Sequence, residues 1–124
     1  MNIAIIDKSE LSSMRISSIL SKVKGVKNIV HILDKISILE TLKKMKPDVI
    51  IFDMNMNGSD SLKLLKEIRK LYPGVLIITL TSFSVEQYRK KCREMGIEHC
   101  LNKTSEFDQI QEIISDFLKP KIKE

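Results

Sequence analysis

The feature that most constrains the fold of this chain is a regular alternation between two hydrophobic patterns. Short runs rich in isoleucine, valine and leucine recur along the sequence, and each is followed by a segment whose apolar residues are three and four positions apart. The first pattern is typical of buried strands and the second of amphipathic helices. Five such pairs fill the chain, which predicts five β-α units.

Strict alternation of strands and helices favours an α/β fold, a doubly wound parallel sheet with helices on both faces. The third run, DVIIFD, is apolar throughout between two carboxylates, as in a central strand that is covered on both faces. No linker interrupts the pattern, so we expect one domain over residues 1–119 and a charged tail over 120–124. The predicted strands are 2–7, 28–33, 48–53, 75–80 and 98–102, and the predicted helices are 11–23, 36–46, 62–71, 85–95 and 107–118.

Composition narrows the classes of function. The chain has 124 residues, of which 43% are hydrophobic, enough for a core of its own. No apolar run approaches the roughly 18–20 residues of a membrane span, and the N-terminus lacks the basic segment of a signal peptide. We therefore expect a cytoplasmic protein without membrane contact. The formal net charge is +5, but the lysines are dispersed and no nucleic-acid motif is present, so an acidic protein partner is favoured over direct nucleic-acid binding.

The two cysteines, Cys92 and Cys100, are eight positions apart and form no CxxC motif. The favoured interpretation is a pair of reduced, buried thiols, and the alternative is a disulfide or a redox switch.

Polar residues follow the predicted strands at the point where each strand ends. Asp7 follows the first strand, Asp53 closes the third, Thr81 follows the fourth and Lys103 follows the fifth. In open parallel sheets, ligands bind at the carboxyl ends of the strands, so these side chains should share one crevice. A carboxylate, a cation and a hydroxyl suit phosphoryl transfer to an aspartate, with Asp53 as the nucleophile.

Three segments, DVIIFDMNM, IITLTS and NKTSEF, carry a resemblance to a known family. The chain resembles the receiver domain of bacterial two-component response regulators over residues 2–118. The resemblance implies a flavodoxin-like fold with strand order 2-1-3-4-5 and a role in phosphorelay signal transduction. It also implies that the domain is no enzyme beyond weak self-phosphorylation and dephosphorylation.

The resemblance assigns a role to each matching position. Asp53 matches the phosphoacceptor and Lys103 the lysine that pairs with it. Thr81 matches the switch hydroxyl, while Asp7 and Asn55 match metal-site positions, Asn55 through its backbone carbonyl. The implied partners are a sensor histidine kinase or phosphotransfer protein and a downstream protein. The latter would dock on the fourth helix, fifth strand and fifth helix, where a homodimer could also form.

Four positions depart from the family pattern. Lys8 stands where the family usually has the second acid, a direct Mg²⁺ ligand, and Asn57 and Thr104 replace usual prolines. Cys100 stands where many receivers carry an aromatic residue, so we expect a muted switch. Two aspartates and two lysines would make the pocket neutral before any metal binds, and a nearby lysine opposes Mg²⁺, the cofactor that the family implies.

We expect the Lys8 ammonium to occupy the metal position and to pair with Asp53 or Asp7. Phosphorylation would then proceed weakly, or the domain would be a phosphate-independent pseudo-receiver that binds other proteins. In the alternative, Lys8 extends into solvent and Glu10 or Asp60 helps to hold a metal. Two other classes fit less well: a haloacid-dehalogenase-type phosphatase needs DxD after the first strand, and a flavodoxin needs a glycine-containing phosphate loop there, which KSELSSMR lacks.

Overall fold

A computed structural model describes residues 1–34, 36–55, 61–82 and 85–122. In chain order the elements are β1 (Asn2–Ile6), α1 (Glu10–Leu20), β2 (Asn28–Ile32), α2 (Ile38–Met45), β3 (Val49–Asp53), α3 (Ser61–Leu71), β4 (Leu76–Thr81), α4 (Val85–Glu94), β5 (His99–Asn102) and α5 (Gln109–Ile122). Each predicted strand and helix is present, so the five β-α units are confirmed.

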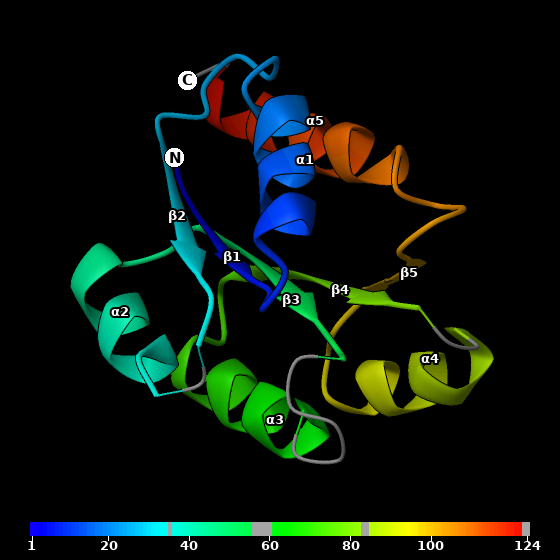
Figure 1. Cartoon of the computed structure of the whole chain (residues 1–124). Coiled ribbons are helices and arrows are strands. Elements are labelled where there is room, and N and C mark those ends of the chain that lie inside the picture. The colour runs from blue at the N-terminus through cyan, green and yellow to red at the C-terminus, as the bar shows by residue number, and fades with distance from the viewer. Residues whose placement is uncertain (35, 56–60, 83–84, 123–124) are drawn as a thin grey trace.

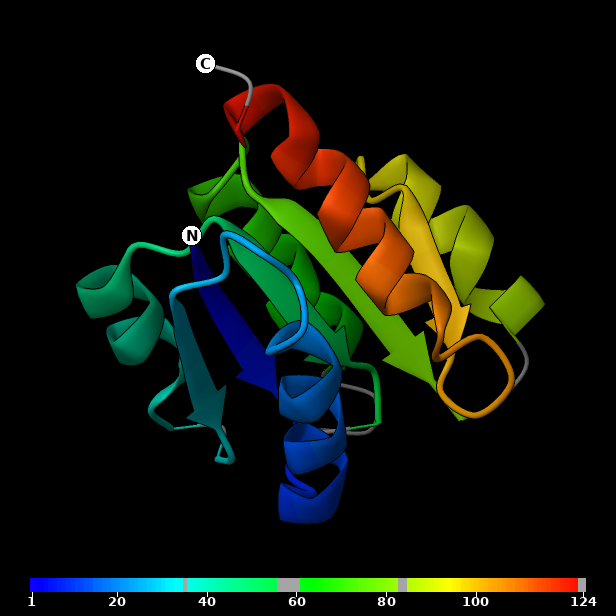
Figure 2. The ribbon, with the colours of Figure 1, turned by 90° about the horizontal axis from the view of Figure 1, so that it is seen from above.

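The five strands form one sheet in the order β2-β1-β3-β4-β5, and every neighbouring pair is parallel. Helices α1 and α5 cover one face of this sheet, while α2, α3 and α4 cover the other (Figure 1). The view from above shows α1 and α5 in front of the sheet, with α5 running alongside β4 (Figure 2). The architecture is the predicted α/β, flavodoxin-like sandwich.

Side-chain alternation along the strands builds two separate cores. In β1, Ile3 and Ile5 pack into the core beneath α1 and α5, whereas Ala4 and Ile6 pack into the core beneath α2, α3 and α4. Successive strand residues point to opposite faces of a sheet, so a strand covered on both faces must be apolar at every position. The four apolar residues of β3, 49–52, are buried for this reason, and the buried Asp53 ends the strand at the carboxyl edge.

The C-terminal ends of two helices differ from the prediction by three residues or more, and the other helix ends differ by two residues or fewer. Helix α1 ends at Leu20, three residues early, because the Ser21 hydroxyl donates a hydrogen bond to the Ser18 carbonyl at 2.7 Å and competes with the helical pattern. Helix α5 continues to residue 122, into the segment expected to be a tail, since extending a packed helix costs little once it has formed. Among the described residues, no helix combines the length and apolar character that a membrane span requires.

Candidate functional site

The carboxyl edge of the sheet brings together Asp7, Asp53, Thr81 and Lys103. Asp53 and Thr81 are the last residues of β3 and β4, and Asp7 lies one residue beyond β1. The hydrogen bonding of the sheet extends to Asp7 and Lys103. The Asp7 N–H donates to the Ile32 carbonyl at 3.1 Å, and the Lys103 N–H donates to the Thr81 carbonyl at 2.8 Å. The parallel register therefore places all four at the same edge of the sheet.

Lys103 joins the two carboxylates. Its Nζ lies 3.0 Å from Asp7 Oδ2 and 3.0 Å from Asp53 Oδ2, and both contacts are ion pairs. Asp7 is 1% exposed and Asp53 is 3% exposed, whereas the Lys103 side chain keeps 19% of its surface in solvent. The partly exposed lysine thus lies over two buried acids.

The second oxygen of each carboxylate accepts a backbone hydrogen bond. The Ser9 N–H donates to Asp7 Oδ1 at 2.8 Å, and the Asn55 N–H donates to Asp53 Oδ1 at 2.9 Å. Both bonds come from the residue two positions later, so each aspartate organises the loop that leaves its own strand. The carboxylates are therefore oriented by their own chain segments as well as by Lys103.

The pKa values of the two acids shift in opposite directions. Burial alone would raise the pKa of Asp7, but the Ser9 N–H, the Ser12 side chain and Lys103 together lower it below its ordinary value. Burial raises the pKa of Asp53, and the Asp7 charge adds to this effect, which outweighs the opposing Asn55 N–H and Lys103. Burial opposes the charge of Lys103, yet its bonds to both aspartates raise the pKa of this lysine.

Lys8 does not lie where we expected it. Its side chain is exposed, and it makes no ion pair with Asp7 or Asp53 in the described structure. Neighbouring side chains of an extended segment point in opposite directions, so a buried Asp7 sends Lys8 outward. The cation between the carboxylates is Lys103. Of the two alternative metal ligands, Glu10 is exposed and Asp60 lies outside the described residues, as does Asn57, which replaces a usual proline.

The donor set at this edge does not fit a directly coordinated Mg²⁺. Two carboxylates are present, both share an ammonium, and the adjacent position carries a lysine instead of an oxygen ligand. Within the described ranges, no group of three histidine, cysteine or acidic side chains is arranged to hold a metal. Mg²⁺ prefers hard oxygen donors in octahedral geometry. The Lys103 ammonium already neutralises part of the negative charge of the two carboxylates.

Asn102 and Glu106 support the site and were not predicted. Asn102 Oδ1 accepts the N–H groups of Thr104 and Ser105, both at 2.9 Å, and Glu106 Oε1 accepts the Asn102 N–H at 2.9 Å. These bonds shape the turn that presents Lys103. The signal was an asparagine at the start of a turn, since its side chain bonds the backbone two residues on.

Comparison with known proteins identifies the family. The model of the response regulator receiver domain matches residues 3–115. The chain belongs to the receiver domain family. Among solved structures, the receiver domain of a DNA-binding response regulator from Colwellia psychrerythraea 34H superposes with a TM-score of 0.86 at 19% identity, covering 96% of this chain and 98% of that one.

Curated relatives show where such receiver domains occur. The uncharacterized transcriptional regulatory protein YesN of Bacillus subtilis is 32% identical over 81 residues, which are 62% of this chain and 22% of YesN. The response regulator protein VraR of Staphylococcus saprophyticus is 23% identical over 112 residues, 90% of this chain and 54% of VraR. A stretch of the sensor histidine kinase RcsC of Escherichia coli is 28% identical over 66% of this chain and 9% of RcsC. The receiver thus spans only about half or less of these relatives.

Proposed function

We propose that this receiver accepts a phosphoryl group on Asp53 and, in response, changes the surface formed by α4, β5 and α5. The phosphoryl donor would be a sensor histidine kinase or a phosphotransfer protein in the cytoplasm, and the surface would bind a downstream protein or a second copy of the chain. The observation that carries the proposal is the contact of Lys103 Nζ with both carboxylates at 3.0 Å. This contact places the buried Asp53 carboxylate beside the cation that phosphorylated Asp53 needs.

The chemistry follows from this arrangement. A carboxylate oxygen of Asp53 attacks the phosphorus of a phosphohistidine, the P–N bond breaks, and its electron pair returns to the imidazole. Lys103 then neutralises negative charge on the phosphoryl oxygens, which adds electrostatic stabilisation where charge gathers. We assign the buried Thr81 hydroxyl as the donor that bonds the phosphoryl group in the active state. In this role the domain is a phosphoacceptor and catalyses no more than its own modification.

A phosphate-independent pseudo-receiver is the second candidate. It is favoured by one observation, that Lys103 already pairs with both carboxylates while Lys8 supplies no oxygen to a metal. In that case the ion-paired crevice would hold one conformation, and the domain would bind its partner constitutively.

Intact mass after exposure to a small phosphodonor, with and without Mg²⁺, separates the two candidates. The proposal expects the mass of one phosphoryl group on the wild-type protein and none on Asp53→Asn. Asp108→Asn is the matched control, because it removes an exposed carboxylate with the same change of charge and should be modified like the wild type. An unmodified wild type under both conditions would favour the pseudo-receiver.

A further inference from the structure

The chain has two cysteines, and the fold places them together beneath the surface assigned to output. Cys92 lies in α4 and is fully buried, while Cys100 lies in β5 and is 6% exposed. Both belong to the core on the side of α2, α3 and α4. Because no other cysteine competes, any disulfide within one molecule must join this pair.

Thr79 lies next to both cysteines and therefore places them near each other. It pairs with Cys100 across β4 and β5, and its Oγ1 lies 3.7 Å from Cys92 Sγ. The same hydroxyl donates to the His99 carbonyl at 3.2 Å, which fixes it against β5. Cys92 therefore packs over the junction of β4 and β5, and the nearness of the two thiols is the main influence on the pKa of each.

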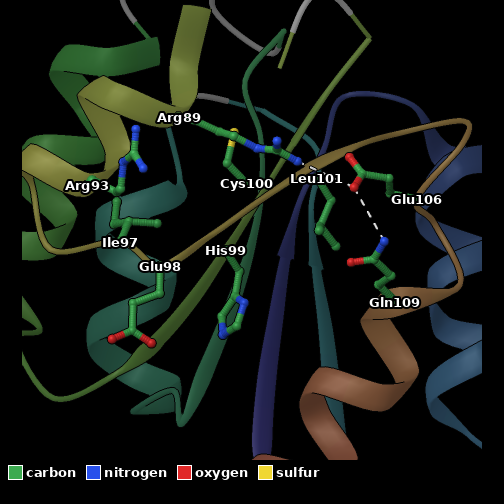
Figure 3. A pocket seen from close by; sticks show the side chains of 9 residues that line it. All are labelled: Arg89, Arg93, Ile97, Glu98, His99, Cys100, Leu101, Glu106 and Gln109. Atoms are coloured by element: carbon green, nitrogen blue, oxygen red, sulfur yellow. Dashed lines mark hydrogen bonds and ion pairs between the residues drawn. The ribbon is translucent and has the colours of Figure 1, made fainter. Parts of the chain in front are cut away.

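Only one of the thiols can meet a small molecule. Cys100 lines a pocket of about 280 Å³ between α4, β5 and α5, and Cys92 is not part of its wall. Figure 3 shows Cys100 in this wall with Arg89 and, on the other side of the pocket, Glu106. The pocket admits molecules of the size of water or a peroxide, so a small reagent reaches Cys100 first.

The surroundings shift the pKa values of the two thiols in opposite directions. The neighbouring Cys92 thiol is the main cause that lowers the pKa of Cys100 to about 7. Thr79 and the Arg89 charge also lower it, while burial and Glu106 oppose the shift. The neighbouring Cys100 thiol and burial raise the pKa of Cys92. The thiolate is the nucleophilic form of cysteine, so Cys100 is the reactive sulfur and Cys92 remains a protonated neighbour.

We propose that Cys92 and Cys100 form a dithiol–disulfide switch between α4 and β5 that responds to hydroperoxides. The Cys100 thiolate attacks one peroxide oxygen, the O–O bond breaks, and after protonation water leaves with Cys100 as a sulfenic acid. The Cys92 sulfur then attacks the Cys100 sulfur, the S–O bond breaks, and a second water leaves with the thiol proton. Two thiols and one hydrogen peroxide thus become one disulfide and two waters.

The disulfide would tie α4 to the edge strand of the sheet. Arg89, on the same helix, pairs with Glu86 at 3.3 Å and with Glu106 at 3.4 Å, so α4 carries the charged rim of the pocket. Oxidation would restrict this rim without any change at Asp53. Transient disulfides with a sensing role are the kind found in reducing compartments. The proposal is independent of phosphorylation.

The experiment treats the native wild-type protein with hydrogen peroxide, unfolds it in acid, labels free thiols and measures intact mass. We expect loss of two hydrogens and of both labels, a monomer on a non-reducing gel, and recovery of both labels after dithiothreitol. Cys92→Ser should trap the Cys100 sulfenic acid, detected as one dimedone adduct, whereas Cys100→Ser should keep its Cys92 thiol. Amides of α4 should exchange hydrogen several-fold more slowly in the oxidised protein.

The measurement on the wild-type protein needs no substitution, so it tests the proposal even if a serine variant fails to fold. Two free thiols after peroxide treatment, or a disulfide that links only separate molecules, would overturn it. Equal reactivity of the two serine variants would overturn the assigned roles. Unchanged exchange of α4 would show that the disulfide forms without restricting the output surface.

Discussion

At the scale of single residues, the site depends on which lysine meets the acids. Lys103 Nζ contacts carboxylates that are 96 and 50 positions away in the sequence, while Lys8, the covalent neighbour of Asp7, is exposed. Asp7 and Asp53 share this cation, yet their pKa values move in opposite directions. The two acids should therefore differ in what they contribute to stability and to ion binding.

Replacing Lys8 by an acid should make this edge of the sheet more attractive to Mg²⁺, even though the side chain at position 8 points to solvent. We predict that Lys8→Asp binds Mg²⁺ about tenfold more tightly than the wild type, because the change removes a repulsive charge and adds an attractive one even in strongly screened surroundings. Isothermal titration calorimetry measures this affinity. Lys22→Asp makes the same change of charge at an exposed position beyond the end of α1 and should leave it unaltered. Equal affinities of Lys8→Asp and wild type would show that position 8 lies outside the site.

The two aspartates should respond to pH with opposite signs. The folded pKa of Asp7 is lowered, so its contribution to stability is present above the ordinary value of 3.8 and is lost as pH falls through the folded pKa. The folded pKa of Asp53 is raised, so its charge costs stability, and this cost appears as pH rises from 3.8 through the folded pKa.

Urea unfolding of the two asparagine variants tests these signs. At pH 7, Asp7→Asn should lower the free energy of unfolding by about 2 kcal/mol, the loss expected for charge-assisted hydrogen bonds, and Asp53→Asn should raise it. At pH 3 both differences from the wild type should shrink. Destabilisation of similar size by both substitutions at pH 7 would contradict the assignment.

At the scale of elements, the ends of the helices show which local sequence signals set the helix boundaries. Ser9 caps α1, since its side chain accepts the Ser12 N–H at 3.2 Å. Helix α2 ends at Met45, two residues before Pro47, and its cap residue Lys46 lies in the left-handed region with φ 53°. A residue with a Cβ is strained there, whereas glycine is not.

Glycine at this cap should therefore stabilise the protein. We predict that Lys46→Gly raises the free energy of unfolding by about 0.5 kcal/mol, because relief of the left-handed strain exceeds the entropy that glycine adds to the unfolded chain. Lys43→Gly, an exposed position within α2, should instead lower it by about 1 kcal/mol. Thermal or urea unfolding measures both, and a loss of stability in Lys46→Gly would count against the strain.

At the scale of the whole molecule, the strands differ in how fully they are buried and paired. β3 pairs with a strand on each side and all its residues are buried, whereas β2 pairs only with β1 and has two exposed residues among its five. Stability in a fold of this kind is greatest where strands are covered on both faces and paired on both edges.

Native-state hydrogen exchange should follow this gradient. We predict that the amides of β3 exchange at least about tenfold more slowly than those of β2, because opening β3 requires separation of both cores while β2 can open at the edge. Exchange measured by NMR or mass spectrometry at neutral pH gives the comparison. Equal protection of β2 and β3 would indicate that the domain opens only as a unit.

The elements, their order along the chain and the residues that end the strands follow from the amino-acid sequence. Alternating patterns are local, and two covered faces force β3 to be apolar up to Asp53, so a parallel sheet followed from the pattern, whereas its strand order came from the family resemblance. The carboxyl ends of parallel strands meet at one edge, so the sequence was enough to assign Asp7, Asp53, Thr81 and Lys103 to the same edge of the sheet.

The contacts at that edge depend on how the chain is arranged in three dimensions. Adjacency in sequence suggested Lys8 as the partner of the carboxylates, but alternation of side chains at a strand end sends it to solvent, and β5 brings Lys103 between them. The nearness of Cys92 and Cys100 in one core was likewise left open by the sequence, because their separation of eight residues is bridged by the turn from α4 into β5. Direction in space, rather than distance along the chain, determines which charges and thiols meet.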